Sequence, residues 1–162
     1  MEVIGKWLET TRVSWAMTHY AWIWPTCETL HFIGLAMLIG TVGIVDLRML
    51  GIAKGLPMAP MHRLARWGIA GFTINTITGV LFFAGKPDQY IGNIGFTLKM
   101  LCIALAGVNV LIFYILVYRR VENLEPGEDA PLSAKIVAAA SLILWLGVMS
   151  FGRSLPYFGN AF

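Results

Sequence analysis

Three side chains that can bind a metal ion or carry a proton stand close together early in the chain: Cys27, Glu28 and His31. Residues three or four apart share one side of a helix, so His31 is expected beside both Glu28 and Cys27. A Glu-x-x-His spacing is how helical bundles present a carboxylate and an imidazole to one metal ion. The spacing alone is common. Here an apolar run follows it, from Phe32 to Val45, and ionisable groups at membrane depth are costly enough to indicate a role.

Each polar residue also has a purely structural interpretation. His31 either binds a cofactor or metal, or forms a hydrogen bond to a neighbouring helix. Glu28 either ligates a metal, orients an imidazole through an N–H···carboxylate bond, or forms an ion pair with Lys99. Lys99 either makes that ion pair or extends its ammonium group to the membrane surface. Near the other end of the same helix, Asp46 and Arg48 are expected to form a local interfacial pair.

The remaining candidate site residues fall at the same end of the predicted helices as His31. His19 precedes the first apolar run, Lys99 begins the third and Arg153 ends the fourth. We therefore expect a polar centre near the outer face of the bundle. His62 belongs to the opposite end, and most of the bilayer thickness should separate it from His31. These two histidines are not expected to bind one heme together.

Membrane helices must position these residues, because the composition excludes other classes of chain. Of the 162 residues, 57% are hydrophobic and 13% are charged, and the mean hydropathy is +0.71. An ordinary globular chain has roughly 45–50% apolar and about 25% charged residues. Disorder, a disulfide-stapled secreted module and a typical soluble enzyme domain are therefore excluded.

The apolar runs predict an all-α fold, an integral membrane four-helix bundle. A spanning helix needs about 20 mostly apolar residues. Three runs contain no charged residue: Trp67 to Ala84, Met100 to Tyr118 and Ile136 to Gly152. The first span is expected from Ala21 to Val45, with Pro25 in its first turn, where a missing N–H costs little.

The first nineteen residues predict a separate element, so the chain divides into residues 1–19 and the bundle of residues 20–162. The apolar side chains of the first segment that fall near one helical face are Val3, Ile4, Trp7, Leu8 and Trp15. This pattern favours an amphipathic helix lying in the membrane interface. The alternative is a frayed surface helix.

The distribution of basic residues predicts the orientation. Seven basic residues flank the first and third connections between spans: Arg48, Lys54, Arg63, Arg66, Arg119, Arg120 and Lys135. Five lie on the other side: Lys6, Arg12, Lys86, Lys99 and Arg153. Cytoplasmic loops carry the excess of Lys and Arg, so both termini are expected in the periplasm of a protein of the bacterial inner membrane. The net charge of +3 then reflects topology, and no nucleic-acid partner is expected.

Polar residues inside such a small bundle predict self-association. Gly71, Asn75 and Gly79 recur at four-residue intervals, which lets a neighbouring helix or a flat cofactor approach closely. The bundle has little interior in which to hide Glu28, Asn75 and Lys99 from lipid. A homo-oligomer, for example a trimer, would shield more of this polar surface.

The pattern W-P-x-x-E-x-L-H-x-x-G, from Trp24 to Gly34, is followed by D-L-R-x-L-G, from Asp46 to Gly51. Together they resemble an uncharacterised family of small bacterial four-helix integral membrane proteins. The layout is more distantly similar to four-helix b-type cytochromes and to copper-resistance inner-membrane proteins. The cytochrome resemblance implies a heme held by membrane histidines. Those cytochromes usually pair histidines on different helices, whereas this chain has no histidine in its third or fourth span.

We therefore expect a membrane-bound heme b protein in electron transfer or small-molecule redox chemistry, with a quinone or another redox partner. His31 would be an axial ligand of the iron, and Lys99 or Arg153 would pair with the propionates. The sixth position would be open or filled by His19. A membrane oxidoreductase activity fits this interpretation, whereas the sequence has no nucleotide-binding glycine loop, nucleophile elbow or H-E-x-x-H motif.

Two other functions remain open at this stage. The first is a periplasm-facing copper binding or transport protein, because copper suits imidazole and thiolate ligands. Its candidate ligands are His31, Glu28, Cys27 and His19, with Cys102 at a similar depth. The second is a structural subunit of a larger membrane complex, whose polar residues only join helices.

Overall fold

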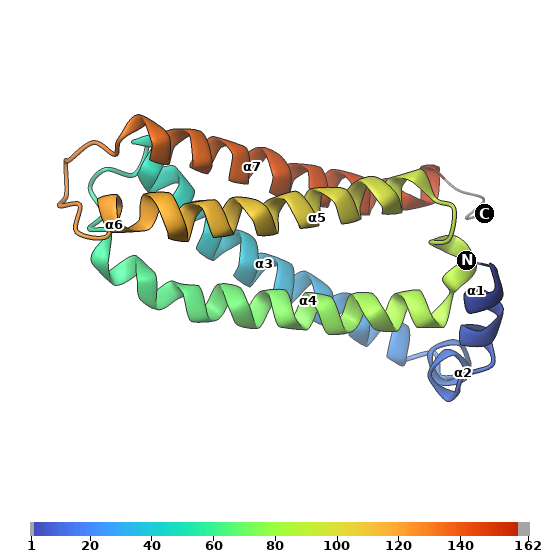
Figure 1. Cartoon of the computed structure of the whole chain (residues 1–162). Helices are drawn as coiled ribbons and strands as arrows, with labels where there is room; N and C mark the ends of the chain where they lie inside the picture. Colours follow the sequence, from blue (N-terminus) through green and yellow to red (C-terminus); the bar gives the residue numbers. More distant parts are fainter. Residues whose placement is uncertain (1, 159–162) are drawn as a thin grey trace.

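Four long helices lie side by side in the computed structural model, which describes residues 2–158 and the side chains of residues 5–61 and 63–158 (Figure 1). They are α3 (Ile23–Leu50), α4 (Ala65–Gly85), α5 (Ile94–Ile112) and α7 (Leu132–Arg153). A 3-10 turn, η1 (Ala59–Leu64), precedes α4, and α5 continues through a π-helical segment, η3 (Phe113–Val117), into α6 (Tyr118–Val121). All four long helices are apolar enough to cross a membrane. The predicted all-α membrane bundle is confirmed.

The N-terminal segment forms two short helices, α1 (Glu2–Glu9) and α2 (Arg12–His19). The chain bends at Thr10 and Thr11, whose hydroxyls donate to carbonyl groups of α1, and Thr11 also caps α2 by accepting from the Ser14 N–H. Helix α2 lies against the end of α4, where the Ser14 hydroxyl donates to the carbonyl oxygen of Gly85 at 3.2 Å. The segment predicted as one helix is thus bent, because two consecutive threonines favour a turn over a continuous helix.

The four long helices form two close pairs. Helix α3 packs along α4, α5 packs along α7, and the pairs meet where α3 contacts α7. A Cβ atom on Gly71 would lie 2.5 Å from the Gly34 carbonyl oxygen, so α3 and α4 are nearly in backbone contact there. Helices α4 and α5 do not pack along each other in the same way. The bundle therefore has one side that is less tightly closed.

Buried apolar clusters fill the middle of the bundle and the end that carries the connections α3–α4 and α6–α7. The cluster at that end comprises Met49, Met58, Met61, Val117, Val121, Ala130, Ala134, Val137 and Ala138. The middle cluster comprises Leu38, Ala106, Trp145 and Val148. The opposite end, where α1, α2 and the last turn of α7 lie, has no such cluster among the described residues (Figure 1). Apolar packing therefore holds the loop end and the middle together.

A buried arginine fastens the loops at this end. The Arg48 side chain is 0% exposed, and its guanidinium donates to the carbonyl oxygens of Leu56 (2.6 Å), Glu125 (2.8 Å) and Glu128 (3.1 Å). The expected pairing of Arg48 with Asp46 is wrong, because these two residues face different surroundings. Asp46 lies beside Ser141 of α7, whereas Arg48 reaches both connections at once. Five donors on one rigid group allow an arginine to satisfy several carbonyls together.

An exposed ion-pair cluster joins the same connections. Asp129 pairs with Lys54, which follows α3, at 3.2 Å, and with Lys135 in the first turn of α7 at 2.8 Å. Hydrogen bonds from these two ammonium groups lower the pKa of the Asp129 carboxyl from its ordinary value. The connection 122–131 is thus attached to both α3 and α7.

We expect replacement of Arg48 by alanine to destabilise the protein. The Arg48→Ala variant leaves three carbonyl groups without their charged donor, and each such bond is worth about 1.5–3 kcal/mol. The free energy of unfolding, measured by SDS titration in mixed micelles, should fall by about 3 kcal/mol or more. The matched control is Arg119→Ala, an exposed arginine at the same end of the bundle. Equal stability of the two variants would contradict the fastening role of Arg48.

Candidate functional site

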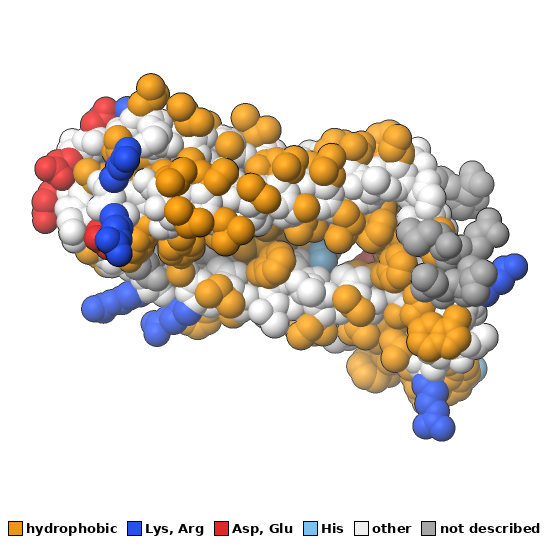
Figure 2. Space-filling view, in the orientation of Figure 1, with side chains coloured by type: hydrophobic (Ala, Val, Ile, Leu, Met, Phe, Trp, Pro, Cys, Tyr) orange, Lys and Arg blue, Asp and Glu red, His pale blue; other side chains and the backbone are white. Residues whose placement is uncertain are grey.

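A hollow opens between α4 and α5 in the half of the bundle nearer α2. Figure 2 shows it between the helices, with one histidine and one acidic side chain visible inside. His31 of α3 belongs to this side of the bundle, because its ring contacts Thr78 and Phe82 of α4 and lies within reach of the charge of Lys99 on α5. Its position follows from the packing of the helices, because α3 forms the back wall where α4 and α5 stand apart. The candidate site is therefore open to one side of the bundle.

The His31 ring is held by a threonine of α4. Its Nδ1 atom lies 2.7 Å from the Thr78 hydroxyl, which is itself 97% buried. That hydroxyl also lies 2.8 Å from the carbonyl oxygen of Ile74, to which it can donate its one hydrogen. In the tautomer that matches this donation, Thr78 accepts from His31 and the neutral imidazole carries its proton on Nδ1. The lone pair is left on Nε2.

The opposite ring nitrogen of His31 is thus the reactive one. Nε2 makes no hydrogen bond within the described part of the chain. A phenylalanine of α4, Phe82, meets the imidazole edge-on, with ring centroids 5.7 Å apart. A hydrogen bond on one nitrogen and an aromatic neighbour fix the ring plane, as is usual for imidazoles that ligate a metal. The arrangement allows Nε2 to bind a metal ion or to accept a proton.

A lysine of α5 brings positive charge to the hollow. Lys99 is half-buried and its side chain runs over Gly152 of α7, where a Cβ atom would lie 3.5 Å from Nζ. Its charge acts on His31 across the hollow. The ion pairs found among the described residues do not include Lys99, so the ion pair with Glu28, one of the three interpretations of that carboxylate, is not formed. Lys99 is free to bind an anionic group.

Glu28 faces the outer mouth of the hollow. Its carboxylate accepts a hydrogen bond from the Trp24 indole N–H at 3.2 Å. Burial, together with the negative charge of Glu28, raises the pKa of the Tyr90 hydroxyl above its ordinary value. Tyr90 belongs to the connection between α4 and α5, so Glu28 and Tyr90 lie at the same end of the hollow. No pattern in the sequence singles out Tyr90 as a site residue.

The other predicted site residues do not converge on His31. His19 is exposed and stacks on Trp15, with ring centroids 4.5 Å apart. Arg153 is exposed at the end of α7, and Cys27 is buried. Across the described residues no three His, Cys, Asp or Glu side chains lie close enough to hold a metal ion. The proposed copper ligands Cys27, Glu28, His31 and His19 therefore do not form a coordination sphere here.

The small residues near His31 serve helix packing. A Cβ atom on Gly34 would lie 2.8 Å from the Gly71 carbonyl oxygen, so these two glycines close the α3–α4 contact and leave no space for a flat cofactor. Gly71 is also unavailable to a second subunit, whereas Gly79 has nothing within 4 Å of its Cβ position. Self-association stays a prediction.

Thr78 could have been found from its spacing, since it follows Gly71 by seven residues and thus shares the face toward α3.

We expect the Glu28→Gln variant to lower the pKa of the Tyr90 hydroxyl. Removing the negative charge makes the tyrosinate less unfavourable, while the burial of Tyr90 is unchanged. Ultraviolet absorbance near 295 nm, followed against pH, measures the titration, and Tyr90→Phe identifies its contribution. Glu122→Gln, at the other end of the bundle, is the control and should leave the curve unchanged. An unchanged titration in Glu28→Gln would place Glu28 away from the hollow.

Comparison with known proteins adds a family but no activity. The sequence profile of a family of unknown function (DUF6644) matches residues 4–158. The curated proteins and the solved structures contain no significant match to the chain.

Proposed function

Because the chain belongs to the DUF6644 family, whose description assigns no activity, we propose a function from the geometry of the hollow. The protein binds heme b between α4 and α5 and serves in electron transfer or small-molecule redox chemistry. The observation that carries the proposal is the His31 imidazole, whose Nδ1 is engaged by Thr78 and whose Nε2 is free. Heme iron in proteins is commonly held by one histidine nitrogen of this kind.

The residues around the hollow fit a heme. His31 would supply the axial nitrogen, and Thr78 would fix the ring orientation from the other side. The ring pair of Phe82 and Trp24, with centroids 5.1 Å apart, offers an apolar wall. The Lys99 ammonium would pair with a propionate, since it has no acidic partner among the described residues.

The described residues offer one axial ligand. His19 stacks on Trp15 at the exposed side of α2, and a movement of α2 would be needed to bring it to the iron. We therefore propose a site with one protein ligand and an open position. A heme bound in this way supplies one-electron chemistry and a place for a small molecule on the iron. Within this site, Glu28 and Tyr90 would contact whatever enters from the outer mouth.

We expect the absorption spectrum to test the proposal directly. The purified protein, expressed with adequate heme supply, should show a Soret band that responds to dithionite. His31→Ala should lose this band, because it removes the iron ligand. His19→Ala and His62→Ala are the matched histidine controls and should keep it. Thr78→Val should retain heme but shift the reduction potential, because the imidazole loses its hydrogen-bond acceptor.

A colourless protein would overturn the heme proposal. Elemental analysis of the same sample would then separate the two alternatives: bound copper would favour the metal-binding function, and its absence would favour a structural subunit of a larger complex. Retention of the Soret band in His31→Ala would move the heme away from the hollow.

We further propose that the chain lies in the bacterial inner membrane with both termini in the periplasm, which places the hollow in the periplasmic half. The support is the excess of basic residues on the side of the connections 51–58 and 122–131. An alkaline phosphatase fused after Gly127 should be inactive, because this enzyme works only in the periplasm, while a fusion to the C-terminus should be active. The reverse result would place the hollow in the cytoplasmic half.

A further inference from the structure

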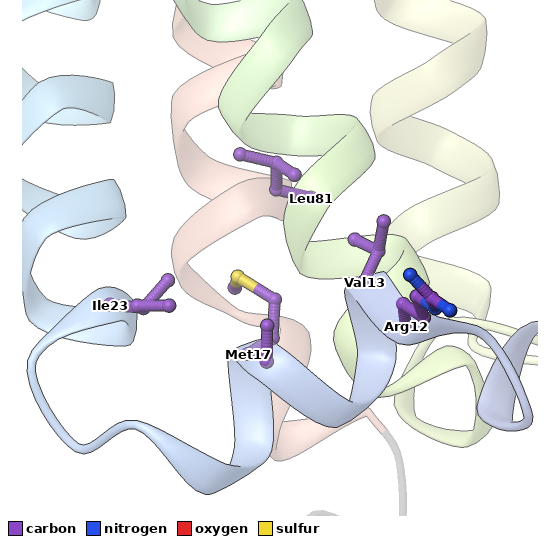
Figure 3. A pocket seen from close by; sticks show the side chains of 6 residues that line it. Arg12, Val13, Met17, Ile23 and Leu81 are labelled. Carbon is purple, nitrogen blue, oxygen red and sulfur yellow. The ribbon is translucent and has the colours of Figure 1, made fainter.

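An apolar groove lies between α2 and the bundle, away from the hollow of His31. It has a volume of about 310 Å³, and its lining is almost entirely apolar. Figure 3 shows its side chains around one space, with Val13 and Met17 from α2, Ile23 from α3 and Leu81 from α4. Arg12 stands at its edge. The groove is open on one side, so its occupant would enter from the surroundings of the protein.

A second hollow adjoins the first. It has a volume of about 320 Å³, shares Met17 with the groove, and is lined at one side by Lys86. Lys86 follows Gly85, whose carbonyl oxygen binds the hydroxyl of Ser14 on α2. Arg12 and Lys86 are both exposed, and neither takes part in an ion pair within the described chain, although Glu9 and Asp88 are near in sequence. One unpaired cation therefore stands at each of two adjoining hollows, Arg12 at the groove and Lys86 at the second hollow, and the two hollows meet at Met17.

The groove lies where a membrane surface would be. Ile23 is the first residue of a span and Gly85 the last residue of another, so Leu81 lies one turn inside the apolar layer and Arg12 and Lys86 lie at its edge. Trp15 of α2 and Tyr20, the residue that follows α2, are exposed, and such side chains are typical of the level of lipid headgroups. An occupant at this depth meets hydrocarbon on one side and phosphate on the other.

We propose that this groove binds a phospholipid with an anionic headgroup. One acyl chain lies in the groove against Val13 and Leu81, and the phosphate is bound by Arg12 and Lys86. Apolar walls next to hydrocarbon suit an acyl chain, and two unpaired cations at headgroup depth favour a negatively charged headgroup over a neutral one. The lipid would hold α2 against the end of α4. This inference is independent of the heme proposal.

The test is native mass spectrometry of the delipidated full chain in mild detergent. The probes are dioleoyl phosphatidylglycerol and dioleoyl phosphatidylcholine, which share acyl chains and differ in headgroup charge. Wild-type protein should retain one phosphatidylglycerol more strongly than phosphatidylcholine. Each juxtamembrane cation is worth about a fivefold change in affinity, so Arg12→Ala/Lys86→Ala should bind phosphatidylglycerol about 25-fold more weakly.

Three further variants separate the contributions. Arg12→Lys/Lys86→Arg keeps both charges and should bind as wild type does. Leu81→Trp fills the groove and should weaken the binding of both lipids equally. Arg63→Ala/Arg66→Ala removes two exposed cations at the opposite end and is the matched control, expected to change nothing. Equal retention of the two lipids by the wild type, unchanged binding in Arg12→Ala/Lys86→Ala, or an equal loss in the control would overturn the proposal.

Discussion

The structure depends on one close contact, the crossing of α3 and α4 at Gly34 and Gly71. A Cβ atom on Gly71 would lie 2.5 Å from the Gly34 carbonyl oxygen, so any larger side chain there would push the helices apart. Helices that approach this closely let short side chains meet across the interface. His31, one turn before Gly34, therefore reaches the Thr78 hydroxyl at 2.7 Å. The tightness of the helix pair thus decides which imidazole nitrogen remains free.

The two ends of the bundle are built differently, and the stability of the loop end offsets the weaker packing around the hollow. At the loop end, Arg48 binds three carbonyl groups of both connections over a cluster of buried apolar residues. At the other end, the backbones of α4 and α5 stand apart, and only the rings of Phe83, Tyr90 and Phe96 among the described aromatic residues meet between them. Polar side chains at membrane depth gain nothing from hydrophobic burial and need partners or water. Stability concentrated around Arg48 allows Lys99 to stay unpaired at the opposite end.

The sequence was sufficient to predict the spans, because hydropathy and helical spacing act locally. His31 and Glu28 lie in the first half of α3, the half that follows α2. The partners of these residues could not be predicted, because they depend on how the helices pair. Thr78 contacts His31 because α3 packs against α4 at this point. Arg48 binds carbonyl groups of two connections that are distant in sequence and does not pair with Asp46.

The direction in which the hollow opens bears on its proposed redox partner. His31 lies eight residues after the start of α3, which is about 12 Å along the helix, so it stands below the headgroups but above the bilayer centre. Because α4 and α5 are on the perimeter of the bundle, the gap between them faces lipid. A membrane-dissolved partner such as a quinone could then approach from the side, past Phe82, while a water-soluble one would approach at the mouth formed by Glu28 and Tyr90. A heme at His31 would lie within reach of both routes. Electron transfer between the bilayer and the aqueous phase requires a cofactor that partners can approach from both sides.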